Sequence, residues 1–243
     1  MPLLYDISML SDDVQNLILT SEKYTKWFSE FPEKLLQVNG DAKTVKGTKK
    51  NVLTAILYLA PARLSGYNMC PMAELAKCDG PCLNLAGRGK MKSVQLSRIR
   101  KTLYFMQNRE LFLQQLYREC VTHAIRAGYE GFEPAIRLNG TSDNRWEKIF
   151  WKQMVELHYE YGVRFYDYTK LGSEKIAPNH HLTYSSTGFG QIVDGKKVFF
   201  RNKAGNYDHN WATMRKRLDD GFNVAMAFSS KSSLPKFVKD EET

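Results

Sequence analysis

The chain has 243 residues, of which 43% are hydrophobic and 25% charged, as in a globular protein large enough for one α/β domain and a small appendage. No apolar run approaches the roughly 20 residues that cross a bilayer, and residues 1–11 lack the basic and apolar regions of a secretory signal. We therefore expect a cytoplasmic protein without a membrane partner. The formal charge of +9 favours a polyanionic partner such as DNA or RNA.

Composition divides the chain into three predicted parts. Residues 1–50 are expected to form an N-terminal helical segment and a basic loop, residues 51–235 an α/β domain, and residues 236–243 a charged tail. Within the first part, apolar residues recur at helical spacing over residues 11–36. That periodicity predicts a helix there.

The α/β domain begins with the continuous apolar run 52–59, whose length and following Pro61 predict a buried strand. Residues 61–92 are rich in Gly, Pro and Asn and contain three cysteines, so they predict an irregular loop. Two amphipathic helices are expected next, over 93–108 and 109–127, and Gly128 stops the second.

Strands and helices then alternate to the end of the domain. Strands are predicted at 135–138, 163–168, 181–184 and 222–228, and helices at 144–161 and 208–219. Such alternation favours right-handed crossovers and parallel pairing. The predicted fold is α/β, with a largely parallel sheet, crossover helices and a partial or irregular TIM-like barrel.

Polar residues follow four of these strands, in the segments 139–143, 169–170, 185–187 and 229–231. The carboxyl ends of parallel strands form the ligand face of α/β folds. Asp143 either caps the following helix or acts as a catalytic base. Lys170 either faces solvent or binds a carboxylate or phosphate.

The cysteines of the loop, Cys70, Cys78 and Cys82, have the spacing C-x7-C-x3-C. Clustered thiolates in a cytosolic chain favour a metal over disulfides, and they suit an iron–sulfur cluster or zinc. Three ligands would leave one iron of a [4Fe–4S] cluster open, whereas structural zinc takes four protein ligands. Cys120 is either that fourth ligand or a thiol of the hydrophobic core. Besides an iron–sulfur cluster and zinc, the remaining alternative for the three loop cysteines is that they bind no metal.

Weaker candidates for a fourth ligand are the histidines 123, 180 and 181. Residues 88–101 carry six basic residues and no acid, which predicts either a track for phosphates or a solvated helix face. The Gly87-Arg88-Gly89-Lys90 segment lacks the full pattern of a nucleotide-binding P-loop.

Five separated motifs follow one another between Gly66 and Ser230, namely CPMAELAKCDGPCLNLAGRGK, RELF, AIRLNGTSD, FYDYTK and LTYSSTG. In this order they resemble the phage-encoded gene product 88 family, which implies a location in the host cytoplasm. The layout is also similar to the barrels of radical S-adenosylmethionine enzymes. Family members continue past the final strand, so the charged end at Thr243 implies a shortened variant or a fragment.

The resemblance also implies roles for individual residues. Cys70, Cys78 and Cys82 would carry the metal, with Asp143 and Lys170 as catalytic residues. A bound cofactor would contact three further residues, Asn139, Ser142 and Ser185.

The leading functional hypothesis is a phage iron–sulfur enzyme that binds S-adenosylmethionine at the open iron and acts on nucleic acid or nucleotides. One alternative is a non-catalytic nucleic-acid-binding accessory protein whose loop is stapled by zinc or a cluster. The other is a protein that targets a host enzyme.

Overall fold

The computed structural model describes most of the chain, namely residues 2–38, 47–76, 78, 82, 87–171, 177–186, 189–194, 196–199 and 209–226. Two compact units are present. The first comprises Met1–Asp167 and Ser173–His181, and the second comprises Tyr168–Gly172 and Leu182–Thr243. The predicted charged tail lies outside the described residues, and the predicted boundaries after residues 50 and 235 stay predictions.

The first unit opens with two short helices, α1 (Asp12–Thr20) and α2 (Glu22–Phe28), followed by strand β1 (Leu36–Val38). The prediction of one helix over residues 11–36 is therefore wrong. Ser21 takes an extended conformation, with φ −103° and ψ 113°, and this ends α1 before α2 begins. The strand was missed because three residues are too few for a periodic pattern.

The sheet of the first unit is built around β2 (Val52–Leu57), as predicted from the apolar run. β1 pairs with β2 in antiparallel fashion, with Leu36 opposite Leu57. Two further strands, β3 (Glu133–Arg137) and β4 (Arg164–Thr169), add to it in parallel. Parallel pairing requires crossover connections, and helices supply both of them.

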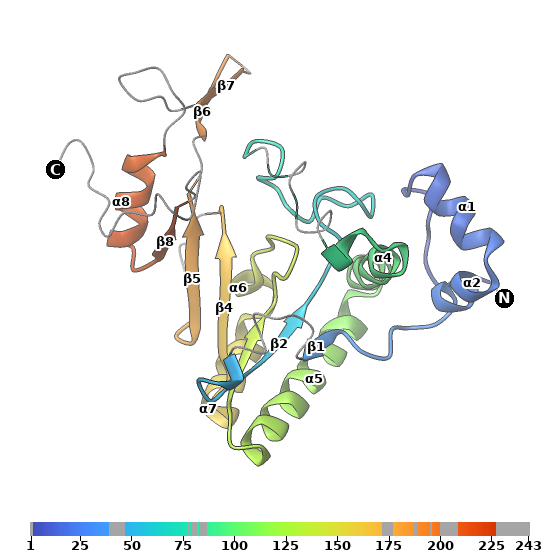
Figure 1. The fold of residues 1–243 in the computed structure, drawn as a ribbon, viewed down its shortest axis with the longest axis horizontal. Helices are drawn as coiled ribbons and strands as arrows, with labels where there is room; N and C mark the ends of the chain where they lie inside the picture. The colour runs from blue at the N-terminus through green and yellow to red at the C-terminus, as the bar shows by residue number, and fades with distance from the viewer. Residues whose placement is uncertain are drawn as a thin grey trace. The chain divides into compact units, whose positions relative to one another are not determined.

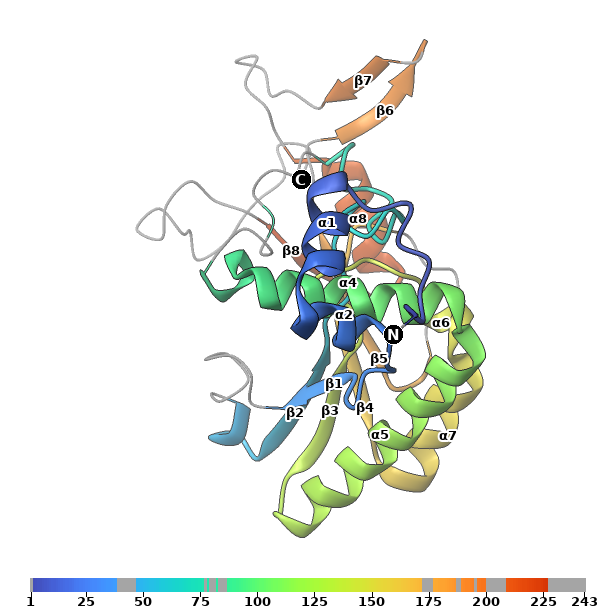
Figure 2. The same cartoon turned by 90° about the vertical axis from the view of Figure 1, so that its right-hand side faces the viewer.

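The crossover from β2 to β3 contains α4 (Lys92–Gln107) and α5 (Arg109–Tyr129), and that from β3 to β4 contains α6 (Trp146–Ile149) and α7 (Trp151–Tyr161). α5 packs on β1, β2 and β3 and also contacts α4 and α7 (Figures 1 and 2). The core between these layers is apolar and includes Leu57, Leu103, Phe112, Leu116, Ile136, Trp146 and Phe165. None of the helices in the described residues is long and apolar enough to cross a membrane.

The second unit contains the parallel pair of β5 (His180–Ser185) and β8 (Asn223–Ala225), and α8 (Trp211–Asp219) packs against β8. The Asn210 side chain accepts a hydrogen bond from the Thr213 backbone N–H at 3.0 Å and caps α8. The segment between β5 and α8 includes an antiparallel hairpin of β6 (Phe189–Val193) and β7 (Lys196–Phe199).

Hydrogen bonding orders the main sheet as β1-β2-β3-β4-β5-β8, so the largely parallel α/β sheet with crossover helices is confirmed. In the described residues β1 and β8 are its edge strands, and the sheet does not close. The barrel part of the fold prediction is therefore not confirmed.

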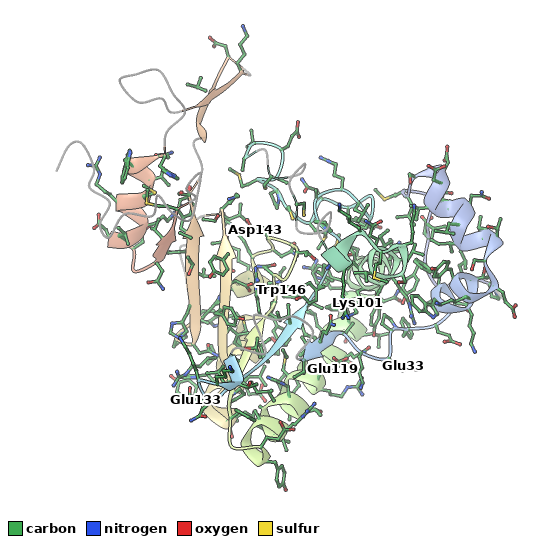
Figure 3. All side chains as sticks on the ribbon, viewed as in Figure 1. Glu33, Lys101, Glu119, Glu133, Asp143 and Trp146 are labelled. Carbon is green, nitrogen blue, oxygen red and sulfur yellow. The ribbon has the colours of Figure 1, made fainter. Side chains whose placement is uncertain are left out.

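Two partly buried side chains, Glu119 of α5 and Lys101 of α4, hold the start of β1 against the helices of the first unit (Figure 3). The Glu119 carboxylate accepts hydrogen bonds from the backbone N–H groups of Leu35 and Leu36, each at 2.8 Å, and Lys101 Nζ donates to the Leu35 carbonyl oxygen at 2.7 Å. Burial lowers the pKa of Lys101 to about 8, although the charge of Glu119 opposes the shift. At any pH at which the Lys101 amine is protonated, its burial therefore lowers the free energy of unfolding.

The exit of β2 is fixed by the loop that follows β3. Gly140 N donates to the Leu57 carbonyl oxygen at 3.0 Å, and Thr141 Oγ1 donates to the Leu59 carbonyl oxygen at 2.6 Å. A Cβ atom at Gly140 would lie 2.7 Å from that Leu57 oxygen and 2.6 Å from Ile56 Cγ2. Only glycine lets the two backbones come this close.

We expect the stability of the fold to rise with pH through the titration of Lys101. Between about pH 8 and the ordinary lysine pKa of 10.5, the folded chain binds fewer protons than the unfolded chain, so the free energy of unfolding increases, by at most about 3 kcal/mol. Urea unfolding at about pH 7 and about pH 10 measures the rise. Lys101→Met should lose it, whereas Lys152→Met, at an exposed position of α7, should keep it. An unchanged rise in Lys101→Met would contradict this explanation.

Gly140→Ala should lower the free energy of unfolding by about 1–3 kcal/mol, because the added methyl group meets a backbone oxygen. Gly128→Ala is the matched control, since no heavy atom lies within 4 Å of its added Cβ and alanine favours the helix. Denaturant unfolding of both variants decides the point. Equal stabilities would show that the close approach imposes no constraint.

Candidate metal centre

The loop that carries the cysteines leaves β2 through a series of tight turns. Met69 N donates to the Ala62 carbonyl oxygen at 2.8 Å, and the Met69 side chain is buried in the core. Cys70 follows directly, and its backbone N–H donates to Asn68 Oδ1 at 3.1 Å. The first predicted ligand is thus held on a hydrogen-bonded turn at the carboxyl end of β2.

The three loop cysteines are thiols rather than disulfides, and each is partly exposed. Cys70 Sγ donates to the Thr141 carbonyl oxygen at 3.6 Å, and Cys78 Sγ donates to the Ala73 carbonyl oxygen at the same distance. Burial raises the pKa of Cys70 to about 11, and the charges of Asp143, Cys82 and Cys78 add to this effect. These three groups therefore lie within electrostatic reach of the Cys70 thiol.

Among the described residues, no three His, Cys, Asp or Glu side chains are placed to hold a metal ion. Residues 77, 79–81 and 83–86 of the loop lie outside the described residues. The ligand set Cys70, Cys78 and Cys82 stays a prediction. The soft thiols and their partial burial fit an iron–sulfur cluster or zinc.

Cys120 has a different environment from the loop cysteines. It lies on α5, is fully buried and belongs to the hydrophobic core of the first unit. Burial raises its pKa. These contacts are those of a core thiol. His123, one of the weaker ligand candidates, is also buried, with Nε2 3.1 Å from the Leu53 carbonyl oxygen.

The predicted catalytic residue Asp143 lies beside the cysteine loop (Figure 3). Its backbone N–H donates to the Met69 carbonyl oxygen at 2.9 Å, one residue before Cys70. Its negative charge raises the pKa of the Cys70 thiol. The structure thus brings together two candidate residues that are 73 positions apart in the sequence.

Asn139 and Ser142, predicted to contact a cofactor, shape the loop that carries Asp143. The Asn139 Oδ1 atom accepts hydrogen bonds from Ser142 Oγ at 3.0 Å, Asn144 N at 2.9 Å and Trp146 Nε1 at 3.0 Å. Its Nδ2 donates to the Asn144 carbonyl oxygen at 2.9 Å. Both side chains are buried, so in this structure they position the loop; direct contact with a cofactor stays a prediction.

Asp167 supports the same loop from β4 and was not identified from the sequence. Its carboxylate, 1% exposed, accepts hydrogen bonds from the backbone N–H groups of Leu138 and Asn139 and lies 3.4 Å from Arg137 Nε. His180 Nε2 is 3.9 Å away. Strand alternation in FYDYT gave the one available signal, because it puts an aspartate on the buried face.

Much of the basic run on α4 is used inside the fold. Arg100 donates to the Glu30 carbonyl oxygen through Nε at 3.3 Å and through an Nη atom at 3.1 Å. Lys101 anchors β1, as described above. The Arg98 guanidinium stacks 5.2 Å from the centre of the Tyr58 ring. These three residues are neither a simple solvated face nor an open phosphate track.

Three other basic residues, Arg88, Lys90 and Lys92, are exposed where the 3-10 helix η2 (Gly87–Lys90) leads into α4. Arg88 and Lys90 lie in η2 and Lys92 begins α4, so all three directly follow the cysteine loop in the sequence. Burial lowers the pKa of Arg98, and the charge of Cys82 opposes that shift, so Cys82 lies within electrostatic reach of this residue of α4. The three exposed basic residues follow Cys82 by six to ten positions in the sequence.

Lys170 and Ser185, the remaining predicted site residues, contact each other in the second unit. Lys170 Nζ donates to Ser185 Oγ at 2.9 Å and lies 3.4 Å from the Ser185 carbonyl oxygen. The two residues are at the ends of β4 and β5, where the sequence placed them. Their predicted roles toward a substrate or cofactor stay predictions.

Comparison with known proteins identifies the family. The family model described as Gene product 88 matches residues 33–240, which covers β1, the cysteine loop and the sheet. No curated protein and no solved structure matches the chain. The likeness to radical S-adenosylmethionine barrels therefore has no support from a relative. The match over most of its length shows that the chain belongs to the Gene product 88 family of phage proteins.

Proposed function

We propose that this phage protein holds a [4Fe–4S] cluster on Cys70, Cys78 and Cys82. The observation that supports the proposal is the Cys70 environment, in which a half-buried thiol lies within electrostatic reach of two further thiols and a carboxylate. Burial, together with repulsion from these groups, disfavours the Cys70 thiolate in the metal-free chain. A cationic centre would reverse that cost, because thiolate ligands and metal ions neutralise each other.

Three cysteine ligands would leave one iron open to a small molecule, and we propose S-adenosylmethionine as that molecule. A reduced cluster supplies one electron to a ligand of this kind. Asp143 would bind the ligand's amine or a ribose hydroxyl, since it lies beside Cys70 on a loop that Asn139 and Ser142 hold in place. In the second unit, Lys170 and Ser185 would bind an anionic group such as a carboxylate.

The proposed substrate is a nucleic acid or a nucleotide. The formal charge of +9 supports this, as do the three exposed basic residues Arg88, Lys90 and Lys92, which directly follow the cysteine loop in the sequence. A phosphate backbone bound there would approach the metal centre. The same basic residues also suit an accessory protein that binds nucleic acid without catalysis and uses zinc or a cluster as a staple.

Replacement of single loop cysteines tests the ligand set. We expect Cys70→Ser, Cys78→Ser and Cys82→Ser each to lose most of the iron that the parent chain retains after reconstitution without oxygen, because serine is a poor ligand for iron–sulfur clusters. Cys120→Ala, which removes the core thiol, should keep its iron. Iron content per folded chain is the measurement, with circular dichroism as the check on folding. Full iron in Cys70→Ser would rule out the ligand set.

Nucleic-acid binding should weaken steeply with salt and should depend on the three exposed basic residues that follow the cysteine loop. Replacing Arg88, Lys90 and Lys92 together by alanine should reduce the slope of log affinity against log salt for duplex DNA by about 3, or roughly 0.9 for each lost phosphate contact. The matched control replaces three exposed lysines at a distance in sequence, Lys23, Lys26 and Lys34.

Gel retardation and fluorescence anisotropy over a salt series measure both variants. Equal weakening in the two triple variants would show only a general charge effect. An absence of binding by the parent chain at low salt would exclude nucleic acid as the partner.

A further inference from the structure

Two adjacent serines at the carboxyl end of β5 have different partners, both within the second unit. Ser185 Oγ accepts a hydrogen bond from Lys170 Nζ at 2.9 Å. Ser186 Oγ lies 2.7 Å from His209 Nδ1. Successive residues of an extended chain point to opposite sides, so the two contacts are separate features.

The backbone on both sides of the serine–histidine contact is fixed. Ser186 N donates to the Ala225 carbonyl oxygen of β8 at 2.9 Å. On the other side, Trp211 N donates to the His209 carbonyl oxygen at 3.1 Å, and the Trp211 ring packs edge-on against the imidazole with a centroid distance of 6.2 Å. The hydrogen bond therefore joins two ordered segments.

The surroundings of the contact suit a reacting group. Ser186 and His209 are both half-buried, so the pair is neither fully enclosed by the protein nor fully open to water. Ser186 directly follows β5, and the carboxyl ends of parallel strands are where α/β folds bind ligands. His209 directly precedes Asn210, the N-cap of the nine-residue helix α8, whose positive dipole end favours developing negative charge.

A serine hydroxyl within hydrogen-bond distance of an imidazole nitrogen is the arrangement of an activated nucleophile and its general base. We propose that Ser186 and His209 form such a pair and cleave an ester. This site does not involve the cysteines, so it stands or falls independently of the proposed metal centre.

The proposed reaction has two steps. With the imidazole proton on Nε2, His209 Nδ1 takes the hydroxyl proton while Ser186 Oγ bonds to the ester carbonyl carbon. The carbon–oxygen bond to the alcohol then breaks, and the departing oxygen takes the proton from His209. In the second step, a water molecule attacks the acyl-serine carbonyl carbon and gives a proton to His209 Nδ1. The bond between that carbon and Ser186 Oγ then breaks, which releases the acid, and Nδ1 returns the proton to Ser186 Oγ.

Reaction with a fluorophosphonate tests the pair directly, because the serine oxygen displaces fluoride and keeps a stable phosphonyl group. The full chain should gain the mass of one adduct, and peptide mapping should place it on Ser186. Ser186→Ala should abolish that adduct. His209→Gln should slow labelling at least tenfold, since a general base typically contributes about 10²–10⁴-fold.

Two matched controls should label at the rate of the parent chain. Thr183→Ala removes a hydroxyl from the same strand, and His158→Gln removes an imidazole from α7 of the first unit. Unfolding curves establish that each variant is folded. An unlabelled parent chain, an adduct on Ser185, or a labelling rate that His209→Gln leaves unchanged would each overturn the proposal.

Discussion

The close approach of the β3 loop to the end of β2 is the constraint on which the candidate metal centre depends. Gly140 brings its backbone against the Leu57 carbonyl oxygen, where no side chain fits. The same loop then meets the cysteine loop twice, through Asp143 N to the Met69 carbonyl oxygen and through the Thr141 carbonyl oxygen to the Cys70 thiol. Two loops that are distant in sequence thereby come together at the carboxyl ends of neighbouring parallel strands, where α/β folds bind ligands.

A buried carboxylate stabilises the loop that follows β3. Asp167 brings a carboxylate into the core, and its desolvation is offset by two backbone N–H groups and by Arg137. Removing one partner of such a set leaves the other charge buried and unpaired. Glu119 and Lys101, which are only partly buried, hold the backbone at Leu35 through hydrogen bonds. Some of the basic residues thus form contacts within the fold, so fewer of them are available to bind a polyanion than the sequence suggests.

Elements with long periodic or apolar patterns were predicted well from the sequence. The apolar run became β2, and the strand–helix alternation became parallel pairing with helical crossovers. Short-range breaks were not visible in the same patterns, so the interruption at Ser21 was missed. The predicted end of the strand before residue 139 put Asp143 in a loop beside the cysteine loop, and the structure has it there, because the loops that follow neighbouring parallel strands lie at the same edge of the sheet. The roles of Asn139 and Asp167 depend on tertiary hydrogen bonds between strands, which periodicity does not encode.

We propose that the loop cysteines bind a metal cluster and do not merely stabilise a turn. The iron, sulfide and zinc content of the parent chain purified without oxygen, together with its absorption spectrum, tests this proposal. A [4Fe–4S] cluster predicts about four irons with matching sulfide and a broad absorption band at about 400 nm. One zinc without iron, or no metal at all in a folded chain, would contradict it.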